Sequence, residues 1–238
     1  MALEHDELAF LLPDAKCCCS FGREGVSPRT YRQLFDGRRR FVVASGLEHR
    51  SKQGLTPLPP GQYETRDFPV LSLGPTPQVT RAKWRLRVFG QVENELNLNW
   101  EELHEFPLIE ITADVHCVTK WSKFDTRWRG VTVDELLKKV GVKPEVTHLI
   151  AYSYDDYSTN LPIGDVRSAQ GLVALYYDGK PIPAEHGGPA RLLVPHLYFW
   201  KSAKWLKGIE LTDSDHPGFW ETRGYHNYGD PWKEQRYS

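Results

Sequence analysis

Apolar and polar side chains alternate strictly between residues 109 and 117 of this chain. The apolar parity is formed by Ile109, Ile111, Ala113, Val115 and Cys117, and the polar parity by Glu110, Thr112, Asp114 and His116. Successive side chains of a strand point to opposite faces, so this period of two predicts a strand with its apolar face in the core. The thiol of Cys117 is then expected at the end of the row that faces the core.

Shorter apolar runs between turn signals predict further strands. They lie at 84–89, 149–154, 172–177, 191–194 and 208–211. Asp178-Gly179 follows the run at 172–177, and this dipeptide is typical of a tight hairpin turn.

Two capping-box patterns predict short helices. Asn99 and Thr132 each precede a glutamate three residues later, which is the arrangement that satisfies the free amides at a helix start. The first helix is expected to run from residue 100 towards Phe106. The second helix is expected to have an apolar stripe along one face and to end at Gly141. Many short strands and few helices predict an α+β fold, rich in β structure, with a mixed or mainly antiparallel sheet.

Residues 1–56 differ from the rest of the chain. They contain a triplet of cysteines and a triplet of arginines but no long periodic run, and a Pro- and Gly-rich segment at 57–61 follows them. We therefore expect residues 1–56 to form an extension that is poorly ordered or packs separately. Residues 57–238 are expected to form the functional domain.

The charge and the cysteine content of the chain restrict the binding partners and the cellular location that we expect. The 30 basic and 31 acidic residues give a formal net charge of -1, so no overall field favours nucleic acid or an anionic membrane, and no run is long enough to span a bilayer. Cys17, Cys18 and Cys19 are adjacent, unlike a disulfide framework or a zinc knuckle, which favours a reducing, cytoplasmic location. The run RRRFVV at 38–43 is similar to a twin-arginine export signal, but Ser45, Gly46 and a charged stretch interrupt the apolar segment behind it. Export is the minority interpretation.

The residues around Cys117 exclude several chemistries for its thiol and leave others open. A phosphatase-type loop needs an arginine six residues after the cysteine and a glycine-permitted cradle, but Lys123 occupies that position and no glycine intervenes. The sequence contains no Gly-x-Ser-x-Gly, Gly-x-Gly-x-x-Gly or P-loop pattern, and its histidines are too scattered for a zinc site. A metal ligand, a nucleophile and a small core side chain all remain open.

Four segments, taken in order, resemble a known family. They are RDFPVL at 66–71, DVHCVTKWS at 114–122 with WRG at 128–130, EHGGPARLLVP at 185–195 and YFWKSAK at 198–204. Together they resemble the molybdopterin-binding domain of the sulfite oxidase superfamily, most closely its small stand-alone oxidoreductases. The resemblance covers roughly residues 59–237.

The resemblance implies a Mo-molybdopterin cofactor and a set of site residues. Cys117 is expected to supply a thiolate to molybdenum. His116 has the opposite parity and is a catalytic candidate that lines the substrate side, with a local hydrogen bond as its alternative role. Arg191 matches an arginine that binds the phosphate of the pterin, for which a planar guanidinium is suited. The remaining cofactor-binding residues implied by the resemblance are Arg66, Phe68, Tyr154 (or its neighbour Ser153), His186, Ser202 and Lys204. Ordinary roles in turns, strand ends and cavity walls are the alternative for each of them.

The implied activity is molybdenum-dependent oxygen-atom transfer to or from a small sulfur compound of the sulfite or sulfoxide type. No haem domain or dimerisation domain of the full-length sulfite oxidases is present in these residues, so the electron partner is expected to be external and the oligomeric state is open. Trp121-Ser122 after the cysteine is closer to the methionine-sulfoxide reductases than to the sulfite oxidases. The alternative function is a non-catalytic module that retains the fold and binds an anion or a partner.

Overall fold

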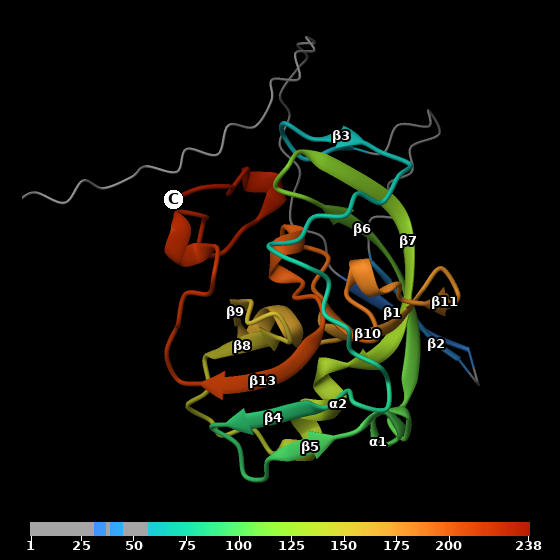
Figure 1. Ribbon diagram of the computed structural model, residues 1–238, viewed down its shortest axis with the longest axis vertical. Helices are drawn as coiled ribbons and strands as arrows, with labels where there is room; N and C mark the ends of the chain where they lie inside the picture. Colours follow the sequence, from blue (N-terminus) through green and yellow to red (C-terminus); the bar gives the residue numbers. More distant parts are fainter. Residues whose placement is uncertain (1–30, 37–38, 45–56) are drawn as a thin grey trace, which may run out of the picture.

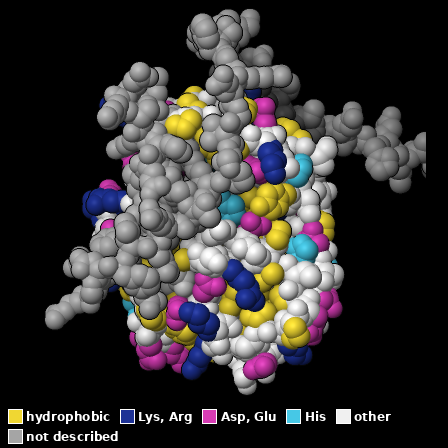
Figure 2. All heavy atoms as spheres, turned by 180° about the vertical axis from the view of Figure 1, so that it is seen from behind, with side chains coloured by type: hydrophobic (Ala, Val, Ile, Leu, Met, Phe, Trp, Pro, Cys, Tyr) yellow, Lys and Arg dark blue, Asp and Glu magenta, His cyan; other side chains and the backbone are white. Residues whose placement is uncertain are grey.

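The computed structural model describes residues 31–36 and 39–44 by their backbone and residues 57–238 in full. The described residues form two sheets that share a core (Figure 1). In the described part of the chain, no helix is long and apolar enough to cross a bilayer. On the face shown in Figure 2, basic and acidic side chains are interspersed, in line with the balanced composition.

The larger sheet has the order β1-β2-β6-β7-β10-β11, with β12 paired to β10 and β3 paired to β7. Its strands are β1 (Tyr31–Asp36), β2 (Arg39–Ala44), β3 (Tyr63–Glu64), β6 (Leu108–His116), β7 (Trp121–Thr132), β10 (Leu172–Tyr177), β11 (Lys180–Pro181) and β12 (Arg191–Leu193). Pairing is parallel between β2 and β6 and between β3 and β7, and antiparallel elsewhere.

The smaller sheet has the order β5-β4-β13-β8-β9. Its strands are β4 (Leu86–Gly90), β5 (Leu96–Leu98), β8 (His148–Ser153), β9 (Ser158–Pro162) and β13 (Leu206–Thr212). Only the β4–β13 pair is parallel among these strands. The expectation of an α+β fold with a mixed, mainly antiparallel arrangement is confirmed.

Both predicted α-helices form where the capping patterns placed them. In α1 (Trp100–His104) the Asn99 side chain accepts from the backbone of Glu102, whose own carboxylate accepts from Asn99. In α2 (Val133–Val140) Thr132 caps the start and the apolar stripe is buried. Short 3₁₀ helices complete the fold at Ile163–Val166, Ala184–His186, Phe199–Lys201, Glu221–Arg223 and Pro231–Lys233.

Two clusters of buried apolar side chains hold the sheets together. One surrounds α2 and includes Trp84, Leu136 and Ile209, and the other surrounds the end of β6 and includes Val115 and Trp128. Full burial of each large apolar side chain contributes roughly 1.5–3 kcal/mol, so these clusters are the main source of stability.

The predicted alternation in β6 is confirmed on its apolar side, because Ile109, Ile111, Ala113 and Val115 are all buried. His116, which belongs to the polar parity, is buried as well, because the chain around Tyr198 pairs with it. Strand β7 was not predicted. Its middle alternates between exposed and buried residues, but both of its ends are buried on both faces, which removes the period of two over most of its length.

Part of the predicted extension belongs to the larger sheet. Strands β1 and β2 form a hairpin, and β2 lies parallel to β6. The remainder of residues 1–56, including Cys17 to Cys19 and Arg38, lies outside the described residues. The boundary at residue 57 stays a prediction.

Candidate functional site

A cavity of about 480 Å³ lies between the ends of the two sheets. Several parts of the chain line it. They are the segment at 68–73, the turn after β6, the β8–β9 connection, the segment at 186–191, the 3₁₀ helix Phe199–Lys201 with the residues that follow it, and the aromatic residues Trp220 and Tyr225. The segment at 68–73 belongs to the connection between β3 and β4, which runs from one sheet to the other (Figure 1). Segments far apart in the sequence therefore meet at one site.

Cys117 lines this cavity from the tight connection between β6 and β7. Its amide donates to the carbonyl of Trp121 at 2.8 Å, and its carbonyl accepts from the amide of Lys120 at 3.0 Å. Burial raises the pKa of the Cys117 thiol, whereas hydrogen bonds from Thr119 and Val118 and the charge of Arg236 lower it. The thiol is thus protonated when free, but its surroundings are arranged to stabilise a thiolate once a metal offsets the cost of burial.

The turn that carries Cys117 is held by residues from both ends of the domain. Gln62 donates from Nε2 to the Cys117 carbonyl at 2.9 Å. Arg236 is buried and donates to the carbonyls of Val118 at 2.5 Å and Pro60 at 3.1 Å. No sequence pattern pointed to Gln62 or Arg236, because each acts through backbone groups that lie far away along the chain.

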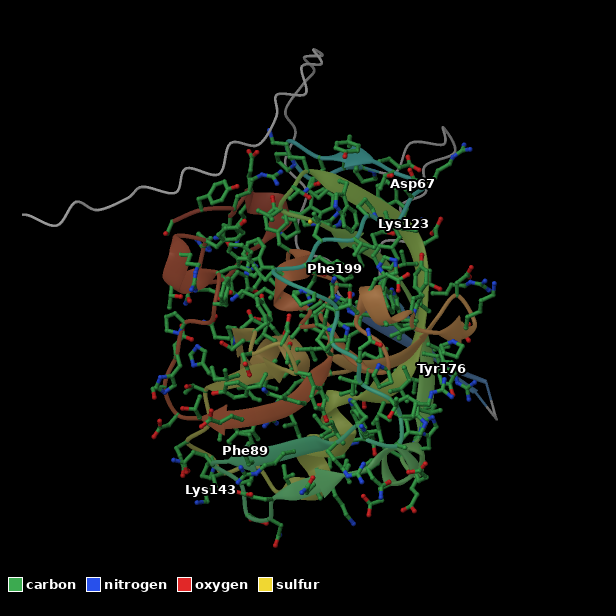
Figure 3. All side chains as sticks on the ribbon, viewed as in Figure 1. Asp67, Phe89, Lys123, Lys143, Tyr176 and Phe199 are labelled. Carbon is green, nitrogen blue, oxygen red and sulfur yellow. The ribbon has the colours of Figure 1, made fainter. Side chains whose placement is uncertain are left out.

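Arg191, on β12, is a buried cation that lines the same cavity. Its guanidinium donates to the carbonyls of His186 at 2.8 Å and Ser202 at 2.6 Å, and it lies 4.1 Å from the centre of the Phe199 ring, which is labelled in Figure 3. Among the residues that the structure describes, no carboxylate forms an ion pair with it. Burial lowers the pKa of Arg191 to about 9, which leaves it charged at neutral pH. A buried charge of this kind is stabilised when an anion binds.

Lys204 places a second cation near Arg191. Its ammonium donates to the carbonyls of Leu71 at 2.7 Å and Glu185 at 2.8 Å and to the Ser72 hydroxyl at 3.0 Å. Burial, followed by repulsion from Arg191, lowers the pKa of Lys204 to about 8. The two cations thus share one part of the cavity, and each lowers the cost of placing an anion there.

His186 and Phe68 form a flat aromatic wall. Their rings stack with centroids 3.9 Å apart and planes inclined by 13°. Burial and then the charge of Arg191 lower the pKa of His186, so its imidazole is neutral at physiological pH. Ser202 completes this part of the cavity, and its hydroxyl accepts from the amide of Val194 at 2.9 Å. Five of the predicted cofactor-binding residues, Phe68, His186, Arg191, Ser202 and Lys204, therefore line one cavity with Cys117.

The other predicted site residues do not line the cavity. Tyr154 follows β8, and its hydroxyl accepts from the amide of Arg85 at 2.7 Å. Its neighbour Ser153 does line the cavity, with a buried hydroxyl that has no hydrogen-bond partner among the described residues. Strand parity explains this difference, because Ser153 shares the inward parity of Leu149 and Ala151.

Arg66 and His116 lie outside the cavity lining too. Arg66 is exposed, and its carbonyl accepts a hydrogen bond from Lys123, which Figure 3 shows close to Asp67. His116 is buried behind the turn, where Nδ1 lies 2.8 Å from the hydroxyl of Ser122. A position behind the thiol suits a supporting role for His116 better than direct contact with a substrate.

Several residues of the cavity were missed by the sequence analysis, notably Tyr157, Trp220 and Tyr225. Burial raises the pKa of Tyr225, and the charges of Tyr237 and Cys117 raise it further. Tyr225 and Cys117 line the same cavity. No spacing rule connects Tyr225 to Cys117, since the two are more than a hundred positions apart. Trp121 and Trp200 line the cavity as well, whereas Trp128 lies in the core.

The cavity suits an elongated ligand with an anionic end and a thiophilic metal. Cys117 offers one soft donor, and Arg191 with Lys204 offers a site for an anion such as a phosphate. Within the described residues, no group of three or more His, Cys, Asp or Glu side chains could hold a metal ion. The residues present therefore fit a metal that a bound organic cofactor holds together with a single protein thiolate.

Comparison with known proteins identifies the ligand class. The profile of the "Oxidoreductase molybdopterin binding domain" family matches residues 73–220, more than half of the chain. An uncharacterized oxidoreductase of Bacillus subtilis, YuiH, is 45% identical over 182 residues, which cover 76% of this chain and 92% of the relative. The putative protein-methionine-sulfoxide reductase subunit YedZ1 of Azospira oryzae is 30% identical over 74% of this chain and 68% of that protein. Mitochondrial sulfite oxidase of Rattus norvegicus is 25% identical over 65% of this chain, which spans only 34% of that protein.

Among solved structures, the chain is similar to the sulfane dehydrogenase SoxCD from Paracoccus pantotrophus. The TM-score is 0.56 at 24% sequence identity, and the match covers 63% of this chain and 42% of the other. At this level of identity the likeness establishes the fold alone. It agrees with the fold expected from the four sequence segments.

Proposed function

Because this chain belongs to the oxidoreductase molybdopterin-binding domain family and is a molybdopterin-dependent oxidoreductase of the sulfite oxidase superfamily, we propose that it transfers an oxygen atom to or from a small sulfur compound. We propose Cys117 as the protein ligand to molybdenum. Arg191 and Lys204 would bind the phosphate of the pterin, and Phe68, His186, Ser153 and Ser202 would line the rest of the cofactor site. Family membership establishes the class of cofactor, whereas these residue roles are our proposal.

One observation carries the assignment of residues. A single cavity joins a buried thiol, Cys117, to a buried guanidinium, Arg191, for which the described residues supply no carboxylate. A thiolate ligand and a phosphate-binding cation are the two protein groups that a phosphorylated, metal-bearing pterin requires. The hydrogen bonds of Arg191 within the described residues go to backbone carbonyls, so its buried charge has no anionic partner there until a ligand supplies one.

When bound, the cofactor supplies the redox chemistry and the exchange of an oxygen atom with the substrate. The protein fixes the direction of the sulfur through the hydrogen bonds of the turn at 117–120. It also places Tyr225 in the wall of the cavity that Cys117 lines, and we propose that the Tyr225 hydroxyl donates a hydrogen bond to a polar substrate there. The aromatic walls exclude water from this part of the cavity, which strengthens each polar contact.

The substrate class is supported by the relatives and by the motif. Names among the relatives refer to methionine-sulfoxide reductase and to sulfite oxidase. The Trp121-Ser122 pair favours a sulfoxide-type substrate over sulfite. Reduction of a sulfoxide consumes two electrons and two protons and releases a sulfide and water, so an external electron donor is required. We propose that a separate redox protein or small carrier in the cytoplasm fills this role.

The test is the metal content of protein produced in a host that makes the cofactor. We expect about one molybdenum per chain in the wild type and a large loss in Cys117→Ser, because the soft thiolate is the protein's only direct bond to the metal in this proposal. Sulfite, sulfoxides and N-oxides would then be screened with artificial electron donors and acceptors. A folded wild-type protein free of molybdenum would refute the proposed function.

A further inference from the structure

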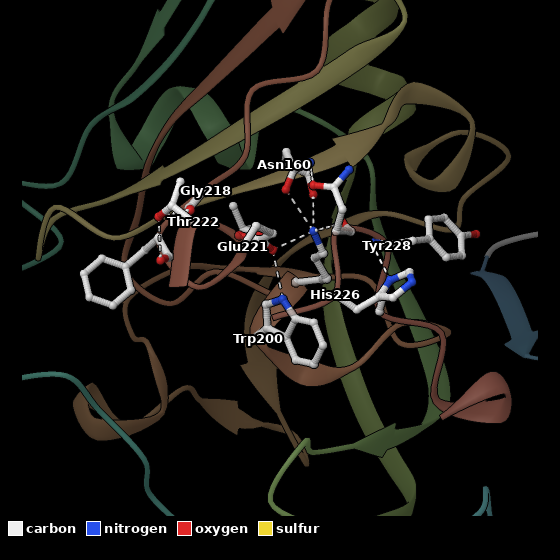
Figure 4. A network of polar contacts seen from close by, with 12 residues as sticks. Asn160, Trp200, Gly218, Glu221, Thr222, His226 and Tyr228 are labelled. Atoms are coloured by element: carbon white, nitrogen blue, oxygen red, sulfur yellow. Dashed lines mark hydrogen bonds and ion pairs between the residues drawn. The ribbon is translucent and has the colours of Figure 1, made fainter. Parts of the chain in front are cut away.

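A buried ion pair, Lys201–Glu221, adjoins Trp200 of the cavity wall, and Figure 4 labels Glu221 and Trp200 within this polar network. The Lys201 ammonium and the Glu221 carboxylate are 2.6 Å apart, and both side chains are only 1% exposed. Lys201 also donates to the carbonyl and side-chain oxygens of Asn160, both at 2.9 Å, and to the carbonyl of Asn227 at 2.6 Å. All the polar atoms around the ammonium are thus acceptors, and the lysine is fully satisfied without a ligand.

The same carboxylate oxygen of Glu221 holds a residue of the cavity wall. It accepts from the indole Nε1 of Trp200 at 2.9 Å and from the hydroxyl of Thr159 at 3.0 Å. Trp200 lines the cavity, whereas Glu221 and Lys201 do not. Glu221 therefore connects a buried charge to the position of one ring that faces the ligand.

Trp200 is one of the rings that pack against Tyr225. Its ring packs edge-on against Tyr225 at 5.2 Å and stacks on Tyr198 at 5.2 Å. From the other side, Trp220 stacks on Tyr225 with centroids 4.7 Å apart. The ring of Tyr237 also packs edge-on against Tyr225 at 5.3 Å. Of these rings, Trp200 is the one that Glu221 holds by a hydrogen bond.

The room for Trp200 to move is small. A Cβ atom at Gly229 would lie 2.8 Å from Cζ2 of Trp200, which shows that the backbone there is already in contact with the ring. The backbone carbonyl of Trp200 also accepts a hydrogen bond from Tyr157 at 2.6 Å. The carboxylate of Glu221 is thus the polar contact that selects the rotation of the indole within a tight slot.

Stability alone does not explain a charge pair at this place. Replacing a buried ion pair with apolar residues of similar volume is often neutral or stabilising, because the charges lose their hydration when they are buried. When the carboxylate of such a pair also accepts a hydrogen bond from the indole of a cavity residue, it fixes the orientation of that indole.

We propose that Glu221 is a positioning residue, which holds Trp200 and thereby sets the place of Tyr225 in the cavity that Cys117 also lines. The catalytic significance of this role rests on the proposed function, because only a substrate or cofactor at Cys117 would sense the hydroxyl. The geometric part is independent of it. Loss of the Glu221 acceptor releases the indole, and Tyr225 then samples other positions.

The experiment uses the full chain labelled with fluorotyrosine, with the Tyr225 resonance assigned from Tyr225→Phe. We expect Glu221→Met to shift the fluorine signal of Tyr225 by more than its linewidth. Glu221→Gln keeps an oxygen acceptor for Trp200, so the Tyr225 signal of this variant should remain at its wild-type position. Asp156→Asn, which removes the exposed Lys207–Asp156 pair, is the matched control and should have no effect.

A second variant covers the case in which Glu221→Met does not fold. Lys201→Met/Glu221→Met removes both charges together, leaves no unpaired ion in the core and should give the same shift. In molybdenum-loaded protein the Mo(V) EPR signal should change in parallel, at unchanged molybdenum content. An unaltered Tyr225 signal in folded protein without Glu221 would overturn the inference, even if its thermal stability is lower. If the protein binds no molybdenum, the proposed function fails, and the fluorine signal still decides the role of Glu221.

Discussion

The hydroxyl of Thr119 donates a hydrogen bond to the sulfur of Cys117 over 3.1 Å. Backbone amides of Val118 and Thr119 also act on the sulfur and, with the hydroxyl, lower the pKa that burial raises. The turn at 117–120 is therefore a small cradle for a thiolate within an otherwise apolar site. This relationship explains how a buried cysteine can serve as a metal ligand.

The Thr119 hydrogen bond is tested by Thr119→Val, which keeps the shape of the side chain but removes the donor. A hydrogen bond to a charged group contributes roughly 1.5–3 kcal/mol, so the pKa of Cys117 should rise further in this variant. The measurement is the pH dependence of thiol alkylation in cofactor-free protein, with Cys17, Cys18 and Cys19 replaced by serine. Thr119→Ser retains the donor and should behave as wild type. Equal pH profiles for the valine and serine variants would contradict the cradle.

The role of Arg191 is tested by Arg191→Met. Its buried guanidinium lacks a carboxylate partner among the described residues, so we expect molybdenum retention to fall by about tenfold or more. The cofactor-free variant should lose less stability than removal of a paired buried charge would cost, roughly 3–5 kcal/mol, because the desolvation cost of the guanidinium disappears with it. Metal analysis and urea unfolding are the measurements. Arg87→Met, at an exposed pair with Glu95, is the control and should retain the metal.

Lys204 predicts a pH dependence of anion binding. The pKa of Lys204 is lowered to about 8, so its ammonium is present below this pH and is lost as the pH rises through it. The affinity of cofactor-free protein for sulfate, which does not itself titrate in this range, should therefore be constant up to about pH 8 and should fall above it, as measured by calorimetry. Bound anion favours the protonated form, so the fall is expected on the alkaline side of this pKa. In Lys204→Met the affinity should be lower at pH 7 and nearly independent of pH in this range; a fall as steep as in wild type would assign the titration to another group.

Gly130 tests the pairing of β7, the strand that carries the chain away from Cys117. A Cβ atom at this position would lie 2.0 Å from the carbonyl oxygen of Val173 on β10. Gly130→Ala should therefore destabilise the protein by about 1–3 kcal/mol or more, because backbone atoms of the sheet must move apart. Gly164→Ala is the matched control, since nothing lies within 4 Å of its Cβ position. Thermal unfolding of both variants checks the difference.

Elements with strong local signals could be predicted from the sequence. The caps at Asn99 and Thr132 and the Asp178-Gly179 turn involve residues close together in the chain, so their patterns identified α1, α2 and the β10–β11 hairpin. Strand β7 could not be predicted from alternation, because contacts from other segments bury both of its faces at its ends.

In the cavity, too, residues in local motifs could be predicted, whereas residues brought in by long-range contacts could not. Cys117 and Arg191 lie in recognisable motifs, whereas Arg236 and Tyr225 reach the cysteine turn only because the C-terminal segment returns to it. The inward position of Ser153 followed from the alternation of β8 and could have been preferred over Tyr154 on that ground.

The most direct test of the central claim is X-ray absorption at the molybdenum edge, which counts the sulfur atoms bound to the metal. With the dithiolene of the pterin supplying two, we predict about three sulfur neighbours in the wild type and about two in any metal-loaded fraction of Cys117→Ser. The variant with Cys17, Cys18 and Cys19 changed to serine should match the wild type. An equal sulfur count in wild type and Cys117→Ser would show that Cys117 does not ligate molybdenum.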